Sequence, residues 1–180
     1  METDATEQSA EQEAVVAEQF IAAGDAADVE ASLALIDPEA QLTVGDNVVA
    51  REGKENWIRL EGVLGFRDEE AVCSASDPTQ VEYSTMRSNR WTDATGGEPE
   101  PNTFFLRIEE GQVTAMRSTA AADGWEEYFE FVMERSSDEE FAAMFVSHPD
   151  GMGIIGLAYT DESIELHSHW TDKFEAAGGD

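Results

Sequence analysis

Residues 102–119, with the sequence NTFFLRIEEGQVTAMRST, decide the fold. The stretch predicts two β-strands joined at Glu110-Gly111, because Gly111 can adopt the positive φ that a tight hairpin turn needs. A two-stranded hairpin cannot bury its apolar side alone in water. Further strands or helices must therefore cover one of its faces.

Side chains alternate between the two faces of each strand of this hairpin. One face of the first strand is entirely apolar and carries Phe104, Leu106 and Ile108. On the second strand, the same alternation places Arg117 on one face with Val113 and Ala115. Arg117 is thus the charged member of an otherwise uncharged face.

The chain before the hairpin predicts three helices and three further strands. Helical spacing of apolar residues begins at Glu13 and ends near Gly24. Asp28 can cap a second helix, which Asp37-Pro38 stops because the residue before a proline avoids the helical region. The remaining predicted segments are a helix at 53–62, strands at 41–44, 71–75 and 80–91, and loops at 63–70 and 93–101.

The chain after the hairpin predicts two more helices and a second hairpin. Residues 125–132 carry an apolar stripe at helical spacing. Ser137 and Glu140 have the spacing of a capping box, which predicts the start of another helix. The segments Gly151–Thr160 and Ser163–Trp170 are predicted as the two strands of the second hairpin.

The composition is strongly acidic. The chain has 40 Asp and Glu residues against 10 Lys and Arg residues, which gives a formal net charge of −30. Nucleic acid phosphates and anionic membrane surfaces carry charge of the same sign, so both are excluded as partners. A surface of this kind is typical of salt-adapted proteins and keeps a chain in solution. The sequence indicates no cofactor.

The length of 180 residues fits one domain with tails. We expect a disordered acidic tail at 1–12, a main domain at 13–123, a C-terminal extension packed on it at 124–171, and a second tail at 172–180. The first residues lack the basic and apolar segments of a secretory signal, so we expect a cytoplasmic protein. Cys73 is the single cysteine, which excludes an internal disulfide.

Three short motifs in this order carry a resemblance to a known family. They are Asp37-Pro38 after the first two helices, REGKENWI at 51–58 in the third helix, and EGQVTAMR at 110–117 in the hairpin. Over residues 13–123 the chain resembles the nuclear transport factor two-like superfamily, in its SnoaL-like branch. The resemblance implies a cone-shaped α+β fold, in which N-terminal helices cover a strongly bent antiparallel sheet around an internal pocket.

The resemblance also implies activities on small organic molecules. The family includes isomerases, cyclases, epoxide hydrolases and dehydratases, as well as non-catalytic modules that bind or dimerise. Its cyclases and epoxide hydrolases usually carry a catalytic Asp at the end of the last hairpin strand, about ten residues after the turn glycine. Here Ala120, Ala121 and Ala122 occupy those positions and Asp123 follows. Since alanine cannot transfer a proton, the sequence leaves open whether this protein is an enzyme.

Asp93, Arg90 and Tyr83 are the catalytic candidates. Epoxide hydrolases of the family use an Arg-x-Asp pair in this region, whereas Arg90 and Asp93 are one residue further apart. In a regular strand that spacing would point the two side chains to opposite faces. A buried Tyr83 hydroxyl could hydrogen-bond a ligand.

Large side chains and one charged side chain are the candidates for ligand contacts, because small-molecule pockets are mostly apolar and aromatic with few polar groups. An arginine in such a pocket could bind a carboxylate or enolate oxygen through its planar guanidinium group. The residues predicted to contact a ligand are Trp57, Trp91, Phe104 and Arg117.

All three histidines fall in the C-terminal extension. On the return strand of the predicted second hairpin, His167, His169 and Glu165 would share one face. Two imidazoles and a carboxylate on one face could bind zinc or another divalent metal, and His148 could complete the set.

Three functions remain open on the sequence alone. The first is a protein that binds a small organic ligand and could also act on it as an isomerase, cyclase or hydratase. The second is a non-enzymatic interaction module, for which we expect a homodimer formed through the outer face of the sheet. The third is a metal-binding protein that uses the His-x-His segment.

Overall fold

The computed structural model describes residues 2–77, 80–119, 124–148, 150 and 153–179. Helices cover α1 (Glu2–Asp25), α2 (Val29–Ala34), α3 (Lys54–Leu64), α4 (Arg90–Thr95), α5 (Trp125–Arg135), α6 (Asp138–Met144) and α7 (Asp161–Ala177), and a short 3-10 turn, η1 (Arg51–Gly53), precedes α3. Strands cover β1 (Ile36–Val44), β2 (Asn47–Val49), β3 (Arg67–Asp77), β4 (Gln80–Ser88), β5 (Glu100–Glu109), β6 (Gln112–Ser118), β7 (Phe145–Ser147) and β8 (Ile154–Leu157). Among these residues, no helix has both the length and the apolar composition of a membrane span.

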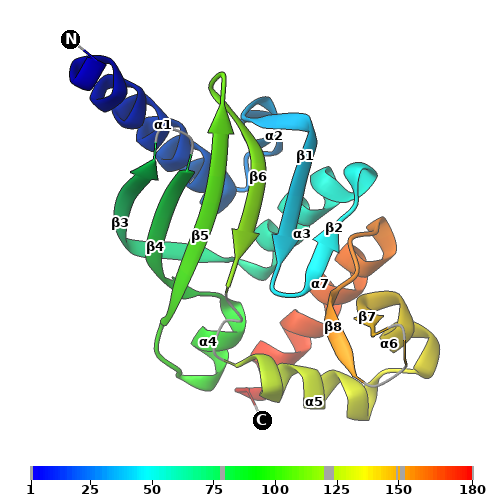
Figure 1. The fold of residues 1–180 in the computed structure, drawn as a ribbon. Coiled ribbons are helices and arrows are strands. Elements are labelled where there is room, and N and C mark those ends of the chain that lie inside the picture. Colours follow the sequence, from blue (N-terminus) through cyan, green and yellow to red (C-terminus); the bar gives the residue numbers. More distant parts are fainter. Residues whose placement is uncertain (1, 78–79, 120–123, 149, 151–152, 180) are drawn as a thin grey trace.

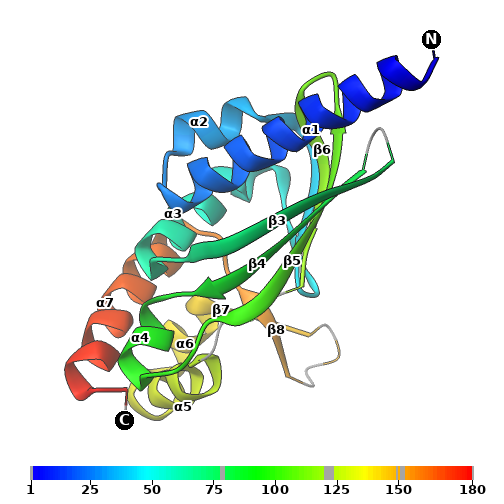
Figure 2. The same ribbon diagram turned by 90° about the vertical axis from the view of Figure 1, so that its left-hand side faces the viewer.

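A curled six-stranded sheet forms the centre of the molecule. Its strands lie in the order β2-β1-β6-β5-β4-β3, and neighbours are antiparallel except for the parallel pair of β1 and β6. Figures 1 and 2 show α1, α2 and α3 across one face of this sheet, with the opposite face left open. The predicted cone-shaped α+β fold is confirmed, although the sheet is mixed rather than purely antiparallel.

The hairpin predicted at 102–119 is confirmed as β5 and β6. Both turn residues have positive φ, 53° at Glu110 and 78° at Gly111, which matches the backbone twist of the flanking strands. A register shift then follows, because Ile108 pairs with Val113 whereas Arg107 pairs with Ala115. This β-bulge adds one residue to β6 and reverses the alternation after it.

The bulge corrects the prediction for Arg117. Beyond the extra residue, Met116 and Ser118 are buried and Arg117 is exposed on the open face of the sheet. Simple alternation from Val113 would have turned Arg117 inward, and it fails because a bulge moves each later side chain to the other face.

Two helix boundaries differ from the predictions for local reasons. Helix α3 passes through Gly62 and ends at Leu64, where Gly65 takes the left-handed conformation with φ of 65°. The strand predicted to run to Trp91 stops at Ser88, because the Asn89 side chain accepts hydrogen bonds from two backbone N–H groups and caps α4. The loops predicted at 63–70 and 93–101 are therefore largely helix ends and strand.

The second predicted hairpin is wrong in its return strand. β8 pairs with β7, which follows directly on α6, and the segment 163–170 belongs to helix α7. The Thr160 hydroxyl caps α7 by accepting a hydrogen bond from the Ser163 N–H. The helix then continues to Ala177 and buries Phe174 completely, so it runs through most of the predicted tail at 172–180. Helix α1 likewise begins at Glu2, inside the segment expected as an N-terminal tail.

The apolar side chains form two cores. The first lies between the sheet and α1–α3 and includes Phe20, Trp57, Leu106 and other buried residues of the cone. The second joins the end of α3 and α4 to the extension, with Trp91 stacked on Tyr128 at 4.3 Å between ring centroids. Helix α3 contributes to both cores, and the extension is thereby packed onto the cone.

His167 lies in the second core with no exposed surface. Its Nδ1 is 2.9 Å from the Tyr128 hydroxyl and its Nε2 is 3.2 Å from the Met144 carbonyl. A neutral ring satisfies both contacts, donating to Met144 and accepting from Tyr128. Burial lowers the pKa of His167 from 6.5 to about 4, against the smaller opposing effect of the Met144 carbonyl.

We expect acid to weaken the fold through this histidine. Between pH 6.5 and about 4 the unfolded chain binds a proton that folded His167 does not, so its stabilising contribution is full above pH 6.5 and declines as the pH falls. The loss across that window should be about 3 kcal/mol. Urea unfolding at several pH values would measure it. A His167→Gln variant should lose less stability over the same window, and equal slopes for the two proteins would contradict the assignment.

Candidate functional site

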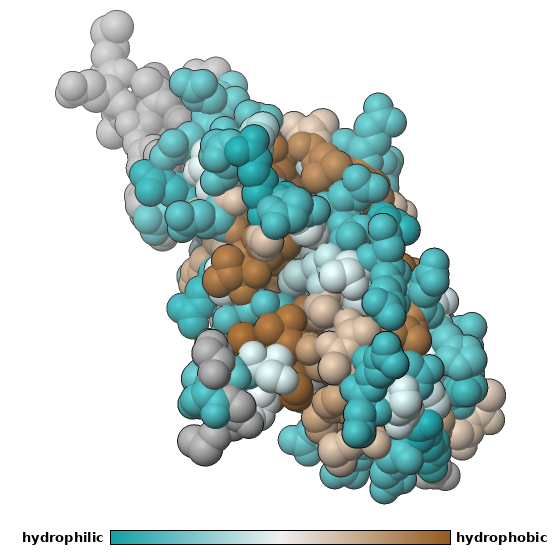
Figure 3. Space-filling model, turned by 90° about the vertical axis from the view of Figure 1, so that its right-hand side faces the viewer, coloured by the Kyte–Doolittle hydropathy of each residue, from teal (hydrophilic) through white to brown (hydrophobic). Residues whose placement is uncertain are grey.

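A cavity of about 360 Å³ lies where the cone meets the extension. Its walls come from β1, α3, β4 and α4 on one side, and from α5 and the β8 strand on the other. Most of its lining is apolar or aromatic, including Trp57, Phe66, Trp91, Trp125 and Tyr159. This size and composition suit a small organic molecule. Figure 3 shows hydrophobic patches framed by hydrophilic residues on the side of the molecule that carries β2, β8 and α7.

An ion pair stands in the wall of this cavity. Arg87 Nη2 donates to Glu61 Oε2 at 2.9 Å, and both side chains are largely buried, at 3% and 14% exposed. The indole N–H of Trp57 donates to the other carboxylate oxygen of Glu61 at 3.0 Å. The Arg87 guanidinium carbon also lies 4.2 Å from the centroid of the Phe66 ring. The pair is therefore held by hydrogen bonds and by a cation–π contact.

Local structure explains why these side chains meet. On α3, Trp57 and Glu61 are four residues apart and lie on the same helix face. On β4, alternation places Arg87 on the buried face with Val81, Tyr83 and Thr85. Because α3 lies across that face of the sheet, the carboxylate of Glu61 meets the guanidinium of Arg87.

A second carboxylate shares the same arginine. Asp68 is 3% exposed, accepts a hydrogen bond from the Thr85 hydroxyl at 2.6 Å, and lies 3.8 Å from Arg87 Nε. Burial raises the pKa of Glu61, the nearby Arg87 opposes that rise, and Asp68 adds to it. Because the pKa of Glu61 is raised above its ordinary value, its carboxyl group can act as a proton donor or acceptor.

The predicted ligand-contact residues divide between the cavity and other parts of the fold. Trp57 and Trp91 line the cavity. Phe104 is buried in the first core instead, with its ring 5.4 Å from the Arg87 guanidinium carbon. Arg117 lies on the open face of the sheet and outside this lining, and the arginine that lines the cavity is Arg87.

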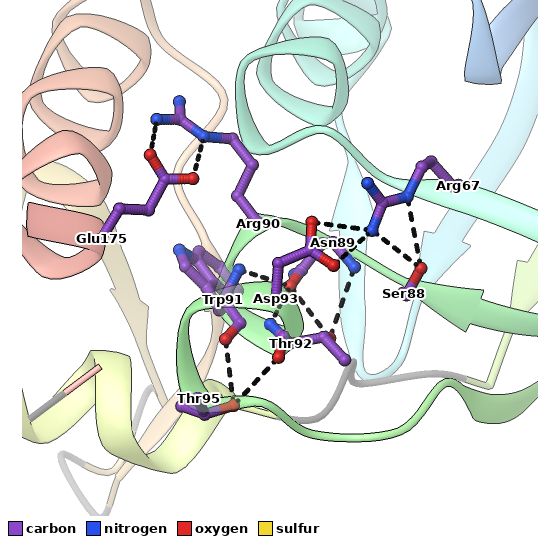
Figure 4. A network of polar contacts seen from close by, with 9 residues as sticks. All are labelled: Arg67, Ser88, Asn89, Arg90, Trp91, Thr92, Asp93, Thr95 and Glu175. Atoms are coloured by element: carbon purple, nitrogen blue, oxygen red, sulfur yellow. Dashed lines mark hydrogen bonds and ion pairs between the residues drawn. The ribbon is translucent and has the colours of Figure 1, made fainter. Parts of the chain in front are cut away.

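Arg90 and Asp93 do not form a pair with each other. Both lie on α4 rather than on a strand, and Figure 4 shows them directed toward different partners. Arg90 pairs with Glu175 and Asp172 on α7 and also donates to the Val63 carbonyl at 3.2 Å. Arg90 thus ties α3 and α4 to α7, and neither Arg90 nor Asp93 belongs to the lining of the cavity.

Asp93 and Tyr83 also lie outside the lining of the cavity. Asp93 is exposed and pairs with Arg67, whose Nη2 lies 2.8 Å from Asp93 Oδ1. Tyr83 is buried in the first core, where burial and the negative charge of Glu18 raise the pKa of its hydroxyl. The catalytic position implied by the family resemblance, residues 120–123, lies outside the described residues.

The predicted metal site does not form. Residues 165–169 are helical, so His167 is turned away from Glu165 and His169, which are exposed while His167 is buried. His148 lies before β8 and contacts Asp150 at 2.5 Å. Among the described residues, no cluster of three or more His, Cys, Asp or Glu side chains could hold a metal ion.

The candidate site residues suggested by the sequence did not include Glu61, Asp68 or Arg87. The signal for Arg87 was present, because a charged residue alternates with Val81 and Tyr83 on a face that must be buried. Glu61 and Asp68 carried no such signal, since acidic residues are abundant throughout the chain. Their burial follows from the packing of α3 and β3 against β4.

Replacing Arg90 should weaken the attachment of α7. We expect Arg90→Met to destabilise the protein by about 2 kcal/mol, because Glu175 and Asp172 lose a common cation and the Val63 carbonyl loses a donor. Arg107→Met is the matched control, as Arg107 forms an exposed pair with Glu109 on the same strand. Urea unfolding measures both, and equal small effects would contradict the structural role of Arg90.

Comparisons with known proteins found similar structures but no similar sequence among curated ones. No family model and no curated protein matches the chain. A "putative polyketide cyclase" from Xanthomonas campestris pv. campestris is 15% identical, with 61% of this chain and 90% of that one covered and a TM-score of 0.48. A "putative polyketide cyclase" from Sinorhizobium meliloti is 14% identical (57% and 92% covered, TM-score 0.47). A "putative ketosteroid isomerase" from Kribbella flavida is 14% identical (60% and 76% covered, TM-score 0.48).

The fold agrees with the resemblance that the sequence motifs carry. Its six-stranded sheet curls without closing into a barrel, and three N-terminal helices cover one face around the hairpin that the sequence predicted. This architecture matches the cone-shaped α+β fold that the resemblance to the nuclear transport factor two-like superfamily implies.

Proposed function

We propose that the protein binds a small organic molecule in the cavity between the cone and the extension, and moves a proton on it with Glu61. The observation that carries this proposal is the buried Glu61–Arg87 pair in the wall of an otherwise aromatic cavity. The names of the similar structures, polyketide cyclase and ketosteroid isomerase, describe chemistry of the same broad kind for those proteins.

The two charged groups have complementary roles in such a reaction. A carboxylate shielded from water is a stronger base than one in solution, and Glu61 lies where it can meet a ligand C–H or O–H group. Arg87 carries a fixed positive charge beside it, which stabilises negative charge that develops on an oxygen of the ligand. The aromatic walls hold the apolar part of the molecule.

The expected ligand is neutral and combines an apolar body with a carbonyl or hydroxyl group. The wall already contains Glu61 and Arg87, whose charges offset each other, and Asp46 adds a negative charge. A strongly anionic ligand would meet this acidic environment in addition to the overall charge of −30. A cytoplasmic location is part of this proposal.

A chromogenic probe can test Glu61 as a base without knowledge of the natural ligand. Removal of the C3 proton of 5-nitrobenzisoxazole breaks its N–O bond and releases a coloured nitrophenolate. Glu61→Gln should lower kcat/KM for this ring opening by about 100-fold, the typical contribution of one general base. Glu165→Gln, which changes an exposed acid on α7, is the matched control. Asp93→Asn tests the catalytic candidate suggested by the sequence.

The same assay gives a pH dependence with a definite direction. Only the carboxylate form of Glu61 accepts a proton, so the rate should rise with pH through the pKa of this group. Burial raises that pKa above the ordinary 4.5, so the midpoint should lie above that value. A folded Glu61→Gln protein with the wild-type rate, or a rate that falls with rising pH, would contradict the proposal.

The open face of the sheet supports a second candidate function, pairing with another copy of the chain. Phe105 is 45% exposed there, beside a groove of about 350 Å³ that Arg107 and Arg117 also line. An exposed aromatic ring flanked by cations, in a chain this acidic, is a typical contact point between proteins.

If the open face joins two copies, Phe105→Glu should convert a dimer to a monomer. The change buries a carboxylate without a partner in the interface and removes its aromatic contact. Sedimentation velocity measures the outcome, with Val48→Glu on the edge strand β2 as the control. A wild-type protein that sediments as a monomer at high concentration would remove this candidate.

A further inference from the structure

A second, much smaller hollow lies behind the wall of the cavity. Its volume is about 20 Å³, which is enough for one water molecule. Trp57 and Glu61 line both spaces, so these two side chains form the partition between them. We call this hollow the chamber. It lies between α1, α2, α3 and the first residues of β3.

Three carboxylates from three different elements line the chamber. They are Asp25 at the end of α1, Glu61 on α3 and Asp68 on β3. Ser32 on α2 also lines it, is 1% exposed, and its hydroxyl has no hydrogen-bond partner within the described part of the protein. Buried hydroxyls are nearly always hydrogen-bonded, to protein or to ordered water. A water molecule in the chamber would satisfy Ser32 and contact the carboxylates.

Asp68 occupies the middle of this arrangement. One of its oxygens accepts from the Thr85 hydroxyl, and the other lies 3.8 Å from Arg87 Nε, a buried donor without a hydrogen bond. Its backbone N–H donates to Asp25 Oδ1 at 3.2 Å. Asp68 therefore stands between the cavity pair on one side and Asp25 on the other.

Asp25 connects the chamber to the surface. The residue is exposed at the end of α1, while its carboxyl group borders the chamber. Partial burial, and then the charge of Asp68, raise the pKa of Asp25 to about 7. A group with such a pKa takes up and releases a proton readily near neutral pH, which is what the outer end of a proton path requires.

We propose that a water molecule in the chamber joins Glu61, Asp68 and Asp25 into a proton relay between the cavity and solvent. The proposal rests on the proposed function, because a base that takes a proton from a ligand must return it to solvent after each reaction. At each step the water gives one proton to a carboxylate and takes one from a carboxyl group. No other bond changes, and one proton moves outward.

The other charged groups around the chamber are compatible with this role. Arg87 supplies a positive charge that contacts Glu61 and Asp68, and it makes a bound metal cation unfavourable. Burial raises the pKa values of Tyr83 and Cys73, with Glu18 adding to both, so these two groups stay protonated at neutral pH. These two groups therefore do not compete with the carboxyl groups of the proposed relay.

The test is the rate at which the Glu61 carboxyl group exchanges its proton with solvent, measured from the width of its ¹³C signal near its titration midpoint. Ser32→Val places an extra methyl group in the chamber and changes no charge, so proton exchange should slow by about tenfold or more if a hydrogen-bonded water carries the proton. Ser32→Ala leaves room for the water and is the matched control. Asp25→Asn should slow exchange as well.

A second measurement locates the water directly. In the wild type and in Ser32→Ala, the backbone amide hydrogen of residue 32 should show a nuclear Overhauser effect to a long-lived water. The Ser32→Val variant should lose this signal. Wild-type exchange rates in a Ser32→Val protein with an unchanged melting temperature would overturn the relay, because the proton would then leave through the cavity. Ring opening that depends on Glu61 and is unchanged in Ser32→Val would leave the proposed function intact, so the two proposals can fail separately.

Discussion

A buried guanidinium group holds the interior of this protein together. Arg87 comes from β4, the strand next to the edge of the sheet, and its charge is met by Glu61 from the covering helix and by Asp68 from the edge strand β3. A buried cation without partners would be strongly unfavourable, so β3, β4 and α3 must keep their positions for the charges to remain matched. The same requirement fixes Trp57, whose indole N–H completes the hydrogen bonding of Glu61.

The C-terminal extension supplies one wall of the cavity beside this charged interior. Without β8 and α5, the end of the cone where Glu61 and Arg87 lie would have no wall on that side. The extension can form that wall because its own core is continuous with α3 and α4 through Trp91, Tyr128 and Leu64. Arg90 adds an electrostatic connection from α4 to α7 at the edge of this second core. Stability of the extension and enclosure of the cavity therefore depend on the same contacts.

Sequence patterns predicted the parts of the fold that depend on neighbouring residues. The Glu110-Gly111 turn, the Asp28 cap and the capping box of Ser137 and Glu140 all occur as predicted, because each is decided by a few side chains and the adjacent backbone. The prediction for residues 163–170 failed, because a short apolar pattern with period two is also compatible with one buried helix face. The Thr160 cap was the local signal for the helix.

The sequence by itself determined the class of fold, the central hairpin and the order of the covering helices, since these follow from periodicity and turn chemistry. Tertiary structure decided the site. Whether an acidic residue is an ordinary surface charge or a buried base depends on which element packs over it, and 40 acidic residues in one chain look alike until the fold separates them. One bulge in β6 turned Arg117 outward, and the packing of α3 on β4 brought Glu61 to Arg87. Both results depend on register and contact between distant segments, which local sequence does not encode.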